Sequence, residues 1–253
     1  MIKSKLLLLT VICGITLVSC KKESLTTLSP ADSLVKTKTE GNLVETYYYD
    51  SQKRVSKIAF LNLNNNDSYY YEYAYSADEV TEYHSNESRH GLEETLPNGV
   101  IKLYCTANPT SYTLNNQGYF IGNSSTCEAN SFIYDDNGFV VTQSYAVTDF
   151  SKNETLKNDS RNIIAINSNG FSFLGGEFKT SVNLDYYYDK PNTIGNKNFG
   201  KLFLGKSSEN LIKSEAENNL TTKYTYSFDN NQRVTSKTIS IGNTEKVTTY
   251  TYY

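Results

Sequence analysis

The stretch YYYDSQKRVSKI, from Tyr47 to Ile58, places a short polar turn between two β-like runs. Variants return as FIYDDNGFVVTQS from Phe132 and YSFDNNQRVTSKTI from Tyr226. An Asp that opens a type I turn accepts a hydrogen bond from the backbone two residues on, and a fourth residue with positive φ matches the twist of a hairpin. The repeated stretch therefore predicts β-hairpins.

Five turns of this form recur along the chain. They share Asp or Asn at the first position, Asn or Gln at the third and often Gly at the fourth: Asp50-Ser51-Gln52-Lys53, Asn115-Asn116-Gln117-Gly118, Asp135-Asp136-Asn137-Gly138, Asn167-Ser168-Asn169-Gly170 and Asp229-Asn230-Asn231-Gln232. Flanking segments such as VETYYY and VSKIAF supply the paired strands. Because the aspartates are explained as turn residues, we do not expect any pair of them to be an acid/base couple.

The composition is that of an all-β protein. The 253 residues include 22 Tyr and 11 Phe but no Trp, and runs of Ala, Leu, Glu and Lys at helical spacing are nearly absent. We predict one antiparallel domain over residues 43–253, a meander of hairpins forming one large twisted sheet or barrel-like sheet with a short loop/helix insert. The net charge of −3 has interspersed signs, so nucleic acid is not an expected partner.

The hairpins resemble YD-type repeats through Tyr49-Asp50 with Arg54-Val55, Tyr134-Asp135 with Gly138, and Phe228-Asp229 with Arg233-Val234. The segment DYYYDKPNTIGNKNFGKLFLGKSSENLIKS, Asp185 to Ser214, resembles a family of uncharacterised bacterial envelope lipoproteins whose domain of unknown function has a porin-like fold. This resemblance implies an extended or closed antiparallel sheet interrupted by one insert. The family has no established activity, so the resemblance implies fold and location only.

The N-terminus resembles a lipoprotein signal peptide. Lys3 and Lys5 precede LLLLTVICGITLVSC, an apolar run too short to span and hold in a membrane. Leu17-Val18-Ser19-Cys20 resembles the bacterial lipobox, which implies cleavage after residue 19 and diacylation of Cys20. The alternative is an ordinary secretory peptide that leaves Cys20 as a free thiol.

Residues 20–42 are predicted to be a lipidated, flexible tether, because KKESLTTLSPADSLVKTKTEGN shows no sustained period. Lys21-Lys22-Glu23 lacks the aspartate of inner-membrane retention and resembles a surface-export signal. We therefore expect a protein anchored by lipid in the outer membrane of a Gram-negative bacterium, facing the periplasm or the outside. Asp32-Ser33-Leu34 resembles an O-glycosylation acceptor.

Gly200 to Ser207, GKLFLGKS, matches the phosphate-loop pattern GxxxxGK[ST]. Its approach, DKPNTIGNKNF, is polar instead of a buried strand, so no nucleotide site is expected. Instead, Leu202, Phe203 and Leu204 are predicted to plug the sheet. Ser207 or Ser208 would then cap a short helix that continues through Leu211 and Ile212.

His84 and His90 are the only histidines, and Glu82, Glu87, Glu93 and Glu94 lie near them in the chain. Their even spacing would place both on one face of a continuous strand, a geometry that a metal site can use. The intervening Ser-Asn-Glu-Ser-Arg reads as a solvated loop, so no metal site is predicted. Neither histidine lies in a recognisable nucleophile context, and no catalytic residue or cofactor is predicted.

Cys105 and Cys127 remain in the mature chain and bracket the hairpin at Asn115 to Gly118. In an oxidising envelope they are a disulfide candidate, and the alternative is two reduced buried thiols.

Three classes of function remain. The leading one is a cell-envelope binding or structural module whose tyrosines offer an aromatic face to a glycan or protein ligand. A hydrolase of envelope or dietary polymers is the second, and a membrane-embedded β-barrel is the third. In the terminal VTTYTYY, Thr249 and Thr251 share a face with Tyr253, which is poor for lipid contact. Clustered carboxylates in a pocket would favour the hydrolase, and an apolar outer belt would favour the membrane barrel.

Overall fold

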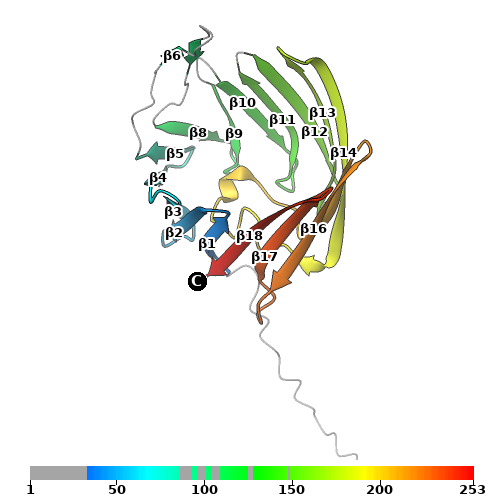
Figure 1. Cartoon of the computed structure of the whole chain (residues 1–253). Helices are drawn as coiled ribbons and strands as arrows, with labels where there is room; N and C mark the ends of the chain where they lie inside the picture. Colours follow the sequence, from blue (N-terminus) through cyan, green and yellow to red (C-terminus); the bar gives the residue numbers. More distant parts are fainter. Residues whose placement is uncertain (1–32, 86–92, 96–100, 104–108, 125–127, 148) are drawn as a thin grey trace, which may run out of the picture.

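The chain folds into a closed barrel of sixteen antiparallel strands (Figure 1). The computed structural model describes residues 33–253 apart from 86–92, 96–100, 104–108, 125–127 and 148. Neighbours in the chain are neighbours in the barrel, and β1 (Val35–Glu40) closes the ring by pairing with both β2 (Leu43–Tyr49) and β18 (Thr244–Tyr252). The predicted all-β meander is thus confirmed, in its closed, barrel-like form.

The other barrel strands are β3 (Val55–Asn62), β4 (Ser68–Tyr75), β5 (Glu79–His84), β8 (Thr110–Leu114), β9 (Phe120–Ser124), β10 (Glu128–Tyr134), β11 (Val140–Val147), β12 (Phe150–Asn158), β13 (Ile163–Ser172), β14 (Gly176–Pro191), β15 (Asn210–Glu217), β16 (Leu220–Phe228) and β17 (Val234–Ile241). A separate two-stranded sheet consists of β6 (Glu93–Thr95) and β7 (Ile101–Leu103). Between β14 and β15 lies one 3-10 turn, η2 (Leu202–Leu204). Among the described residues no helix is long and apolar enough to cross a membrane.

Four of the five predicted turns join strands as expected. At the first, Asp50 Oδ1 accepts hydrogen bonds of 2.9 Å from the backbone N–H groups of Gln52 and Arg54. The same two bonds form at Asn115, Asp135 and Asp229. The fourth turn residues all have positive φ: 63° at Lys53, 79° at Gly118, 85° at Gly138 and 60° at Gln232. A shift of register beside each turn marks the bulge.

The turn predicted at Asn167 to Gly170 is wrong, because these residues lie inside β13. Asn169 pairs with Asn153 and Lys179 on the neighbouring strands. Gly170 is needed for a different reason: a Cβ there would lie 2.1 Å from Ser151 O and 2.6 Å from the Phe178 ring. The glycine lets an aromatic side chain pack across the strand and does not bend the chain.

The predicted boundary between tether and domain at residue 42 is also wrong, because Val35–Glu40 forms β1. The sequence pattern does not identify this strand, because apolar and polar residues do not alternate along it. Lys38 and Glu40 point into the barrel and bond to Glu45 and to Lys246 and Thr248, while Thr37 faces outward and contacts Thr251. A strand with a charged inner face and a polar outer face resembles a tether in sequence.

The hydrophobic core lies inside the barrel. Its buried members come from strands around the ring and from η2: Val35, Tyr47, Val55, Ile58, Tyr73, Val80, Phe120, Phe203, Leu211, Val234 and Tyr250. Partly buried Ile194, Phe199 and Leu204 pack against them from the connection between β14 and β15. We call residues 192–209 the insert; it lies within the ring of strands (Figure 1).

The insert differs from the prediction in two ways. Leu211 and Ile212 belong to β15, not to a short helix, and pair with Tyr187 and Tyr186. The predicted plug is confirmed for Phe203, which is 7% exposed, and for Leu204, but Leu202 is 51% exposed. In η2 successive side chains point about 120° apart, so one face of the turn reaches the core and another reaches water.

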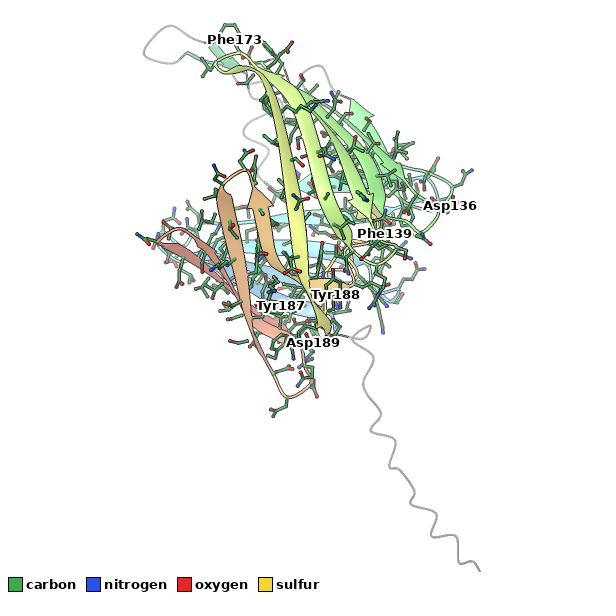
Figure 2. All side chains as sticks on the ribbon, turned by 90° about the vertical axis from the view of Figure 1, so that its right-hand side faces the viewer. Asp136, Phe139, Phe173, Tyr187, Tyr188 and Asp189 are labelled. Carbon is green, nitrogen blue, oxygen red and sulfur yellow. The ribbon has the colours of Figure 1, made fainter. Side chains whose placement is uncertain are left out.

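The outer wall is polar over much of the ring. Exposed polar side chains of β12, β13, β14, β16 and β18 include Asn153, Thr155, Asn167, Asn169, Lys179, Ser181, Asn183, Lys223, Thr225, Ser227, Thr249 and Thr251. Exposed apolar side chains also occur on the barrel strands, among them Leu61, Ile121, Ile133, Phe171 and Val247. Two ion pairs, Lys57–Glu72 at 3.2 Å and Lys213–Asp185 at 2.9 Å, also lie in partly or fully exposed positions. Exposed tyrosines such as Tyr48, Tyr70 and Tyr83 are set among these polar groups. Figure 2 shows the long β13–β14 hairpin, with Phe173 at its tip and Tyr187 to Asp189 near the opposite end.

Candidate functional site

The insert forms a floor across the end of the barrel where the Asp-type turns lie. Its backbone accepts hydrogen bonds from the first residues of two strands, Val35 N to Asn198 O at 2.9 Å and Val55 N to Gly200 O at 3.0 Å. Lys206 N donates to Gly138 O at 2.8 Å, and Val234 N donates to Thr193 Oγ1 at 3.0 Å. Because these contacts come from four separate parts of the rim, the insert is held as part of the barrel.

Buried Glu82 and half-buried Glu45 both face the interior of the barrel above this floor. Glu45 accepts hydrogen bonds from Lys38 Nζ at 2.6 Å and from the hydroxyl of Tyr47. Glu82 contacts His84 Nε2 at 2.7 Å, and the His84 ring stacks on Tyr71 at 4.2 Å between centroids. The two carboxylates therefore belong to hydrogen-bonded networks on β2 and β5.

Lys201, on the floor, lies within electrostatic range of both glutamates. Its ammonium group lies 5.8 Å from the centroid of the Tyr73 ring. Burial lowers the pKa of Lys201, and the negative charges of Glu82 and Glu45 oppose part of that shift. Within the described part of the chain, this ammonium group makes no ion pair within 4.0 Å and no side-chain hydrogen bond.

A second group of charges lines the inner face of β1, β17 and β18. Lys246 Nζ lies 2.5 Å from Glu40 Oε1, and Thr248 Oγ1 donates to the other oxygen of Glu40 at 3.1 Å. Lys237 pairs in register with Thr248 and is within electrostatic range of Lys38, Lys246 and Glu40. We call the interior of the barrel above the insert the lumen. Lys201 on the floor and Lys38, Lys237 and Lys246 on this wall all lie on its lining.

The opposite wall carries a hollow of about 450 Å³ lined by Phe150, Lys152, Glu154, Ile166, Ser168, Phe178, Thr180, Val182, Glu215 and Glu217. Glu154 is fully engaged there, by Lys152 at 2.6 Å, by Ser168 at 2.7 Å and by Gln143. Its pKa is set by burial, which raises it, and by these partners, which outweigh burial and lower it. The charge of Glu154 is therefore compensated by its neighbours.

Aromatic rings complete the lumen. Phe60 stacks on Tyr69 at 4.5 Å between centroids and meets Tyr71 at 4.8 Å, above Glu45 on the same inner face. Aromatic faces beside hydroxyl, carboxylate and ammonium groups can bind molecules that are apolar on one side and hydrogen-bonding on the other. The lumen therefore has the chemical groups of a binding site for a polar organic ligand.

Residues 200–207, which match the phosphate-loop pattern, are packed against the barrel strands and do not form an open loop. Gly200 and Gly205 have φ of 65° and 82°, and a Cβ on Gly205 would lie 2.4 Å from the Tyr134 ring. Backbone N–H groups that would cradle phosphate are already used, Lys206 N by Gly138 O and Gly205 N by Leu202 O. The segment enters β15 directly, so no helix follows the loop. Lys206 and Ser207 line a hollow of about 590 Å³ on the insert.

Of the histidines singled out in the sequence, His84 is described: it ends β5, directly before the predicted loop, and contacts Glu82 on the inner face of the barrel. Cys20, Asp32, His90, Cys105 and Cys127 lie outside the described residues, so lipidation, glycosylation and the disulfide stay predictions. The sequence analysis did not identify Lys201 and Glu45, and it named Glu82 only as a neighbour of the histidines. The available signal was charge at alternate positions, as in Lys38, Glu40 and Glu45, within segments otherwise rich in Thr and Tyr.

No protein-family model and no curated protein matches this chain. Among solved structures, the chain is similar to the crystal structure of a porin-like protein from Bacteroides uniformis ATCC 8492, with a TM-score of 0.54 and 15% sequence identity. The match covers 87% of this chain and 95% of that chain. At this identity the likeness concerns the fold, and the chain has a porin-like, closed β-barrel architecture.

Proposed function

We propose that this chain is a cell-envelope binding protein that holds a polar ligand of the oligosaccharide class in the barrel lumen above the insert. The observation that carries the proposal is the inward placement of both the core and the charged network, with a polar wall outside. Sugar rings present C–H faces to aromatic side chains and hydroxyls to charged groups, which matches the lining of this lumen. Binding without catalysis is part of the proposal.

The anchor belongs to the same proposal. The described chain begins against the insert, where Asn198 Nδ2 donates to Ser33 O at 3.1 Å. If Cys20 is lipidated, the lipid anchor therefore connects to the barrel on the side of its floor.

A membrane-embedded barrel is the second candidate. Closure into sixteen strands and the likeness to a porin-like protein give it more support than the sequence did. Spanning barrels carry an apolar outer band about 25 Å tall, and a Lys or Arg facing lipid at midplane costs about 2–4 kcal/mol. The exposed Ile133, Phe171 and Val247 side chains support contact with lipid. The Asn, Ser, Thr and Lys side chains of β12, β13, β14, β16 and β18 support a barrel surrounded by water.

The two candidates separate when the anchor is removed. The full chain with Cys20→Ala, exported through a secretory signal peptide without a lipobox, should appear in the aqueous fraction and stay monodisperse without detergent. A need for detergent, together with ion conductance across planar lipid bilayers, would establish the embedded barrel instead. Wild-type protein should remain in the membrane fraction in both cases, so it serves as the control for export.

Binding is tested by calorimetric titration of the same protein with a panel of neutral and acidic oligosaccharides. Saturable binding should be weakened by Tyr69→Ala in the lumen and unaffected by Tyr83→Ala, a 46% exposed tyrosine on the outer wall. The reverse pattern would move the site to the outer surface. The bound oligosaccharide should be recovered intact after long incubation, and its cleavage would support the hydrolase.

A further inference from the structure

We infer that the edge of β14 that faces away from β13, at residues 176–181, binds an extended polypeptide segment with basic side chains at alternate positions. This site goes beyond the proposed function, because it lies in the barrel wall near the end opposite the floor. It combines an unpaired strand edge with a hollow that carries negative charge.

The first part of β14 has a described neighbour on one side only. β14 pairs with β13 from Gly176 to Asn183, but with β15 only from Val182 onward. The β15–β16 hairpin therefore ends short of the tip of the β13–β14 hairpin, as Figure 2 shows in orange and yellow. Over residues 176–181, about 20 Å of strand, no described strand occupies the β15 side.

The backbone groups that point to this open edge belong to Glu177, Lys179 and Ser181. Phe173 N donates to Asp149 O at 3.0 Å, so the odd-numbered residues of β13 bond to β12 and the even-numbered ones bond to β14. The register with β13 then directs the N–H and C=O groups of even-numbered β14 residues to β13. Those of the three odd-numbered residues point away from β13, to the side that no described strand fills.

An edge of this kind can accept a further strand. Main-chain hydrogen bonds to the added strand give affinity, and the surroundings of its alternate side chains give specificity. The side chains of Glu177 and Lys179 are exposed on the outer face of the edge. Because charged side chains on an edge disfavour pairing with an apolar strand, the segment that fits is a polar one.

The hollow beside the edge selects the side chains that point inward. It is the hollow of about 450 Å³ described above, in which Phe178 and Thr180 of β14 lie near Glu215 and Glu217 of β15. A strand added at the edge would continue the line of β15, because Val182 already pairs with Glu217. Its side chain opposite Thr180 would point inward and start about 7 Å from Glu217, within reach of a lysine or arginine.

This hollow has an excess of negative charge. Lys152 pairs with Glu154 at 2.6 Å, so these two charges compensate each other. Neither Glu215 nor Glu217 forms an ion pair with any residue that the structure describes. Basic side chains on the added strand would supply the missing positive charge, and an arginine opposite Phe178 would also contact its ring.

A second copy of the chain fits this edge less well. Symmetric pairing of two β14 edges centred on Glu177 or on Lys179 places like charges directly opposite each other. Centring on the residue between them opposes Glu177 to Lys179, but it brings Leu174 of the second copy level with Val182, where β15 already pairs. A single extended segment avoids both conflicts.

The experiment uses seven-residue peptides in which Thr and Arg alternate, with acetylated and amidated ends. Fluorescence anisotropy measures their binding to the full chain with Cys20→Ala. The Thr–Arg peptide should bind saturably, about ten times more tightly than a Thr–Glu peptide. N-methylation at the Thr positions removes the N–H groups that face β14 and should weaken binding about tenfold, whereas N-methylation at the Arg positions should not.

Two substitutions at one position isolate the backbone contribution. Lys179→Pro removes an N–H that points to the open edge and no bond to β13, so the melting temperature should stay near wild type while peptide binding falls about tenfold. Lys179→Ala keeps that N–H and should bind as wild type does. Glu217→Gln should also weaken the Thr–Arg peptide, whereas Asp136→Asn, at an exposed turn beside the floor, should not.

Hydrogen exchange gives a readout that does not depend on affinity. Bound peptide should protect the amides of Glu177 and Lys179, while those of Phe178 and Thr180 are protected with or without it. Equal binding of peptide to wild type and Lys179→Pro, or equal binding of the Thr–Arg and Thr–Glu peptides, would overturn the inference. Absence of binding by every peptide would do the same, as would a dimer of the chain that Lys179→Pro abolishes, because the occupant would then be a second copy.

Discussion

The hydroxyl of Tyr75 donates a hydrogen bond of 2.7 Å to the backbone oxygen of Val55, the first residue of β3. The same relationship joins Tyr49 to Val35, Tyr134 to Phe120, Tyr186 to Ile163 and Tyr252 to Val234, each time at the first residue of a strand. A tyrosine near the end of one strand therefore fixes the start of another strand. These five tyrosine hydroxyls hold the first residues of five strands around the floor.

Tyr75→Phe should destabilise the barrel by about 1–3 kcal/mol, because it leaves the backbone oxygen of Val55 buried without its partner. Tyr48→Phe is the matched control, since Tyr48 is on the outer wall and 45% exposed. Urea unfolding at neutral pH measures both. Equal unfolding midpoints for the two variants would show that this hydrogen bond contributes nothing to stability.

The hairpin meander was predictable because its turns follow local chemistry. Asp or Asn at the first position and a positive φ at the fourth are properties of four residues, and they do not depend on the rest of the fold. Asn167 to Gly170 shows the limit of this reasoning. The same letters lie inside β13, because contacts of Gly170 with Ser151 and Phe178, distant in sequence, decide its conformation.

Closure and the lumen site were not predictable for a related reason. β1 has charged residues inside and threonines outside, so it lacks the apolar period that identifies a half-buried strand. Its partner β18 is more than 200 residues away in the chain, as the Thr37–Thr251 contact shows with a separation of 214. Lys201 comes within electrostatic range of Glu45 and Glu82 only because the insert crosses the barrel.

Gly138→Ala should be more destabilising than Gly118→Ala. Both glycines have positive φ, 85° and 79°, so an alanine costs about 1–2 kcal/mol at either position. A Cβ on Gly138 would also meet the Tyr119 hydroxyl at 2.4 Å, whereas nothing lies within 4 Å of one on Gly118. Thermal melts of the two variants measure the added clash. Equal losses would mean that the Tyr119 ring moves aside without cost.

Acid should weaken the turn at Asp229. Burial raises the pKa of this carboxyl, but the backbone N–H and guanidinium of Arg233 outweigh burial and hold the pKa below its usual range. A carboxyl whose folded pKa is lowered contributes stability that is present above the unfolded pKa, about 3.9, and is lost as pH falls through the folded value. Unfolding free energy should therefore decline below about pH 4, and less steeply in Asp229→Asn. Asp136→Asn, at an exposed turn position, should retain the wild-type slope.

Cys105 and Cys127 should form a disulfide in protein isolated from the envelope. They bracket the β8–β9 hairpin, and a loop of this length adds about 3 kcal/mol by the chain-entropy model. Peptide mapping without reductant should recover one linked peptide pair. Alkylation of both thiols in the native protein would contradict the linkage.

Phe203→Ala should be the most damaging single substitution in the insert. Phe203 is 7% exposed and packs against Tyr75 and Tyr112, with ring centroids 6.3 and 5.7 Å away. Truncating a buried phenylalanine to alanine typically costs about 3–5 kcal/mol. Its neighbour Leu202 is 51% exposed, so Leu202→Ala should cost far less and controls for any general effect on η2. Lys206→Ala should also have little effect, because its side chain is exposed and lies 5.9 Å from the Phe139 ring. Thermal melts of the three variants test the role of the insert as the barrel floor.

A phosphate loop predicts a different pattern, in which Lys206→Ala abolishes binding of ATP with magnesium and Phe203→Ala is tolerated. That pattern in calorimetric titration would replace the packing role of GKLFLGKS with a nucleotide site.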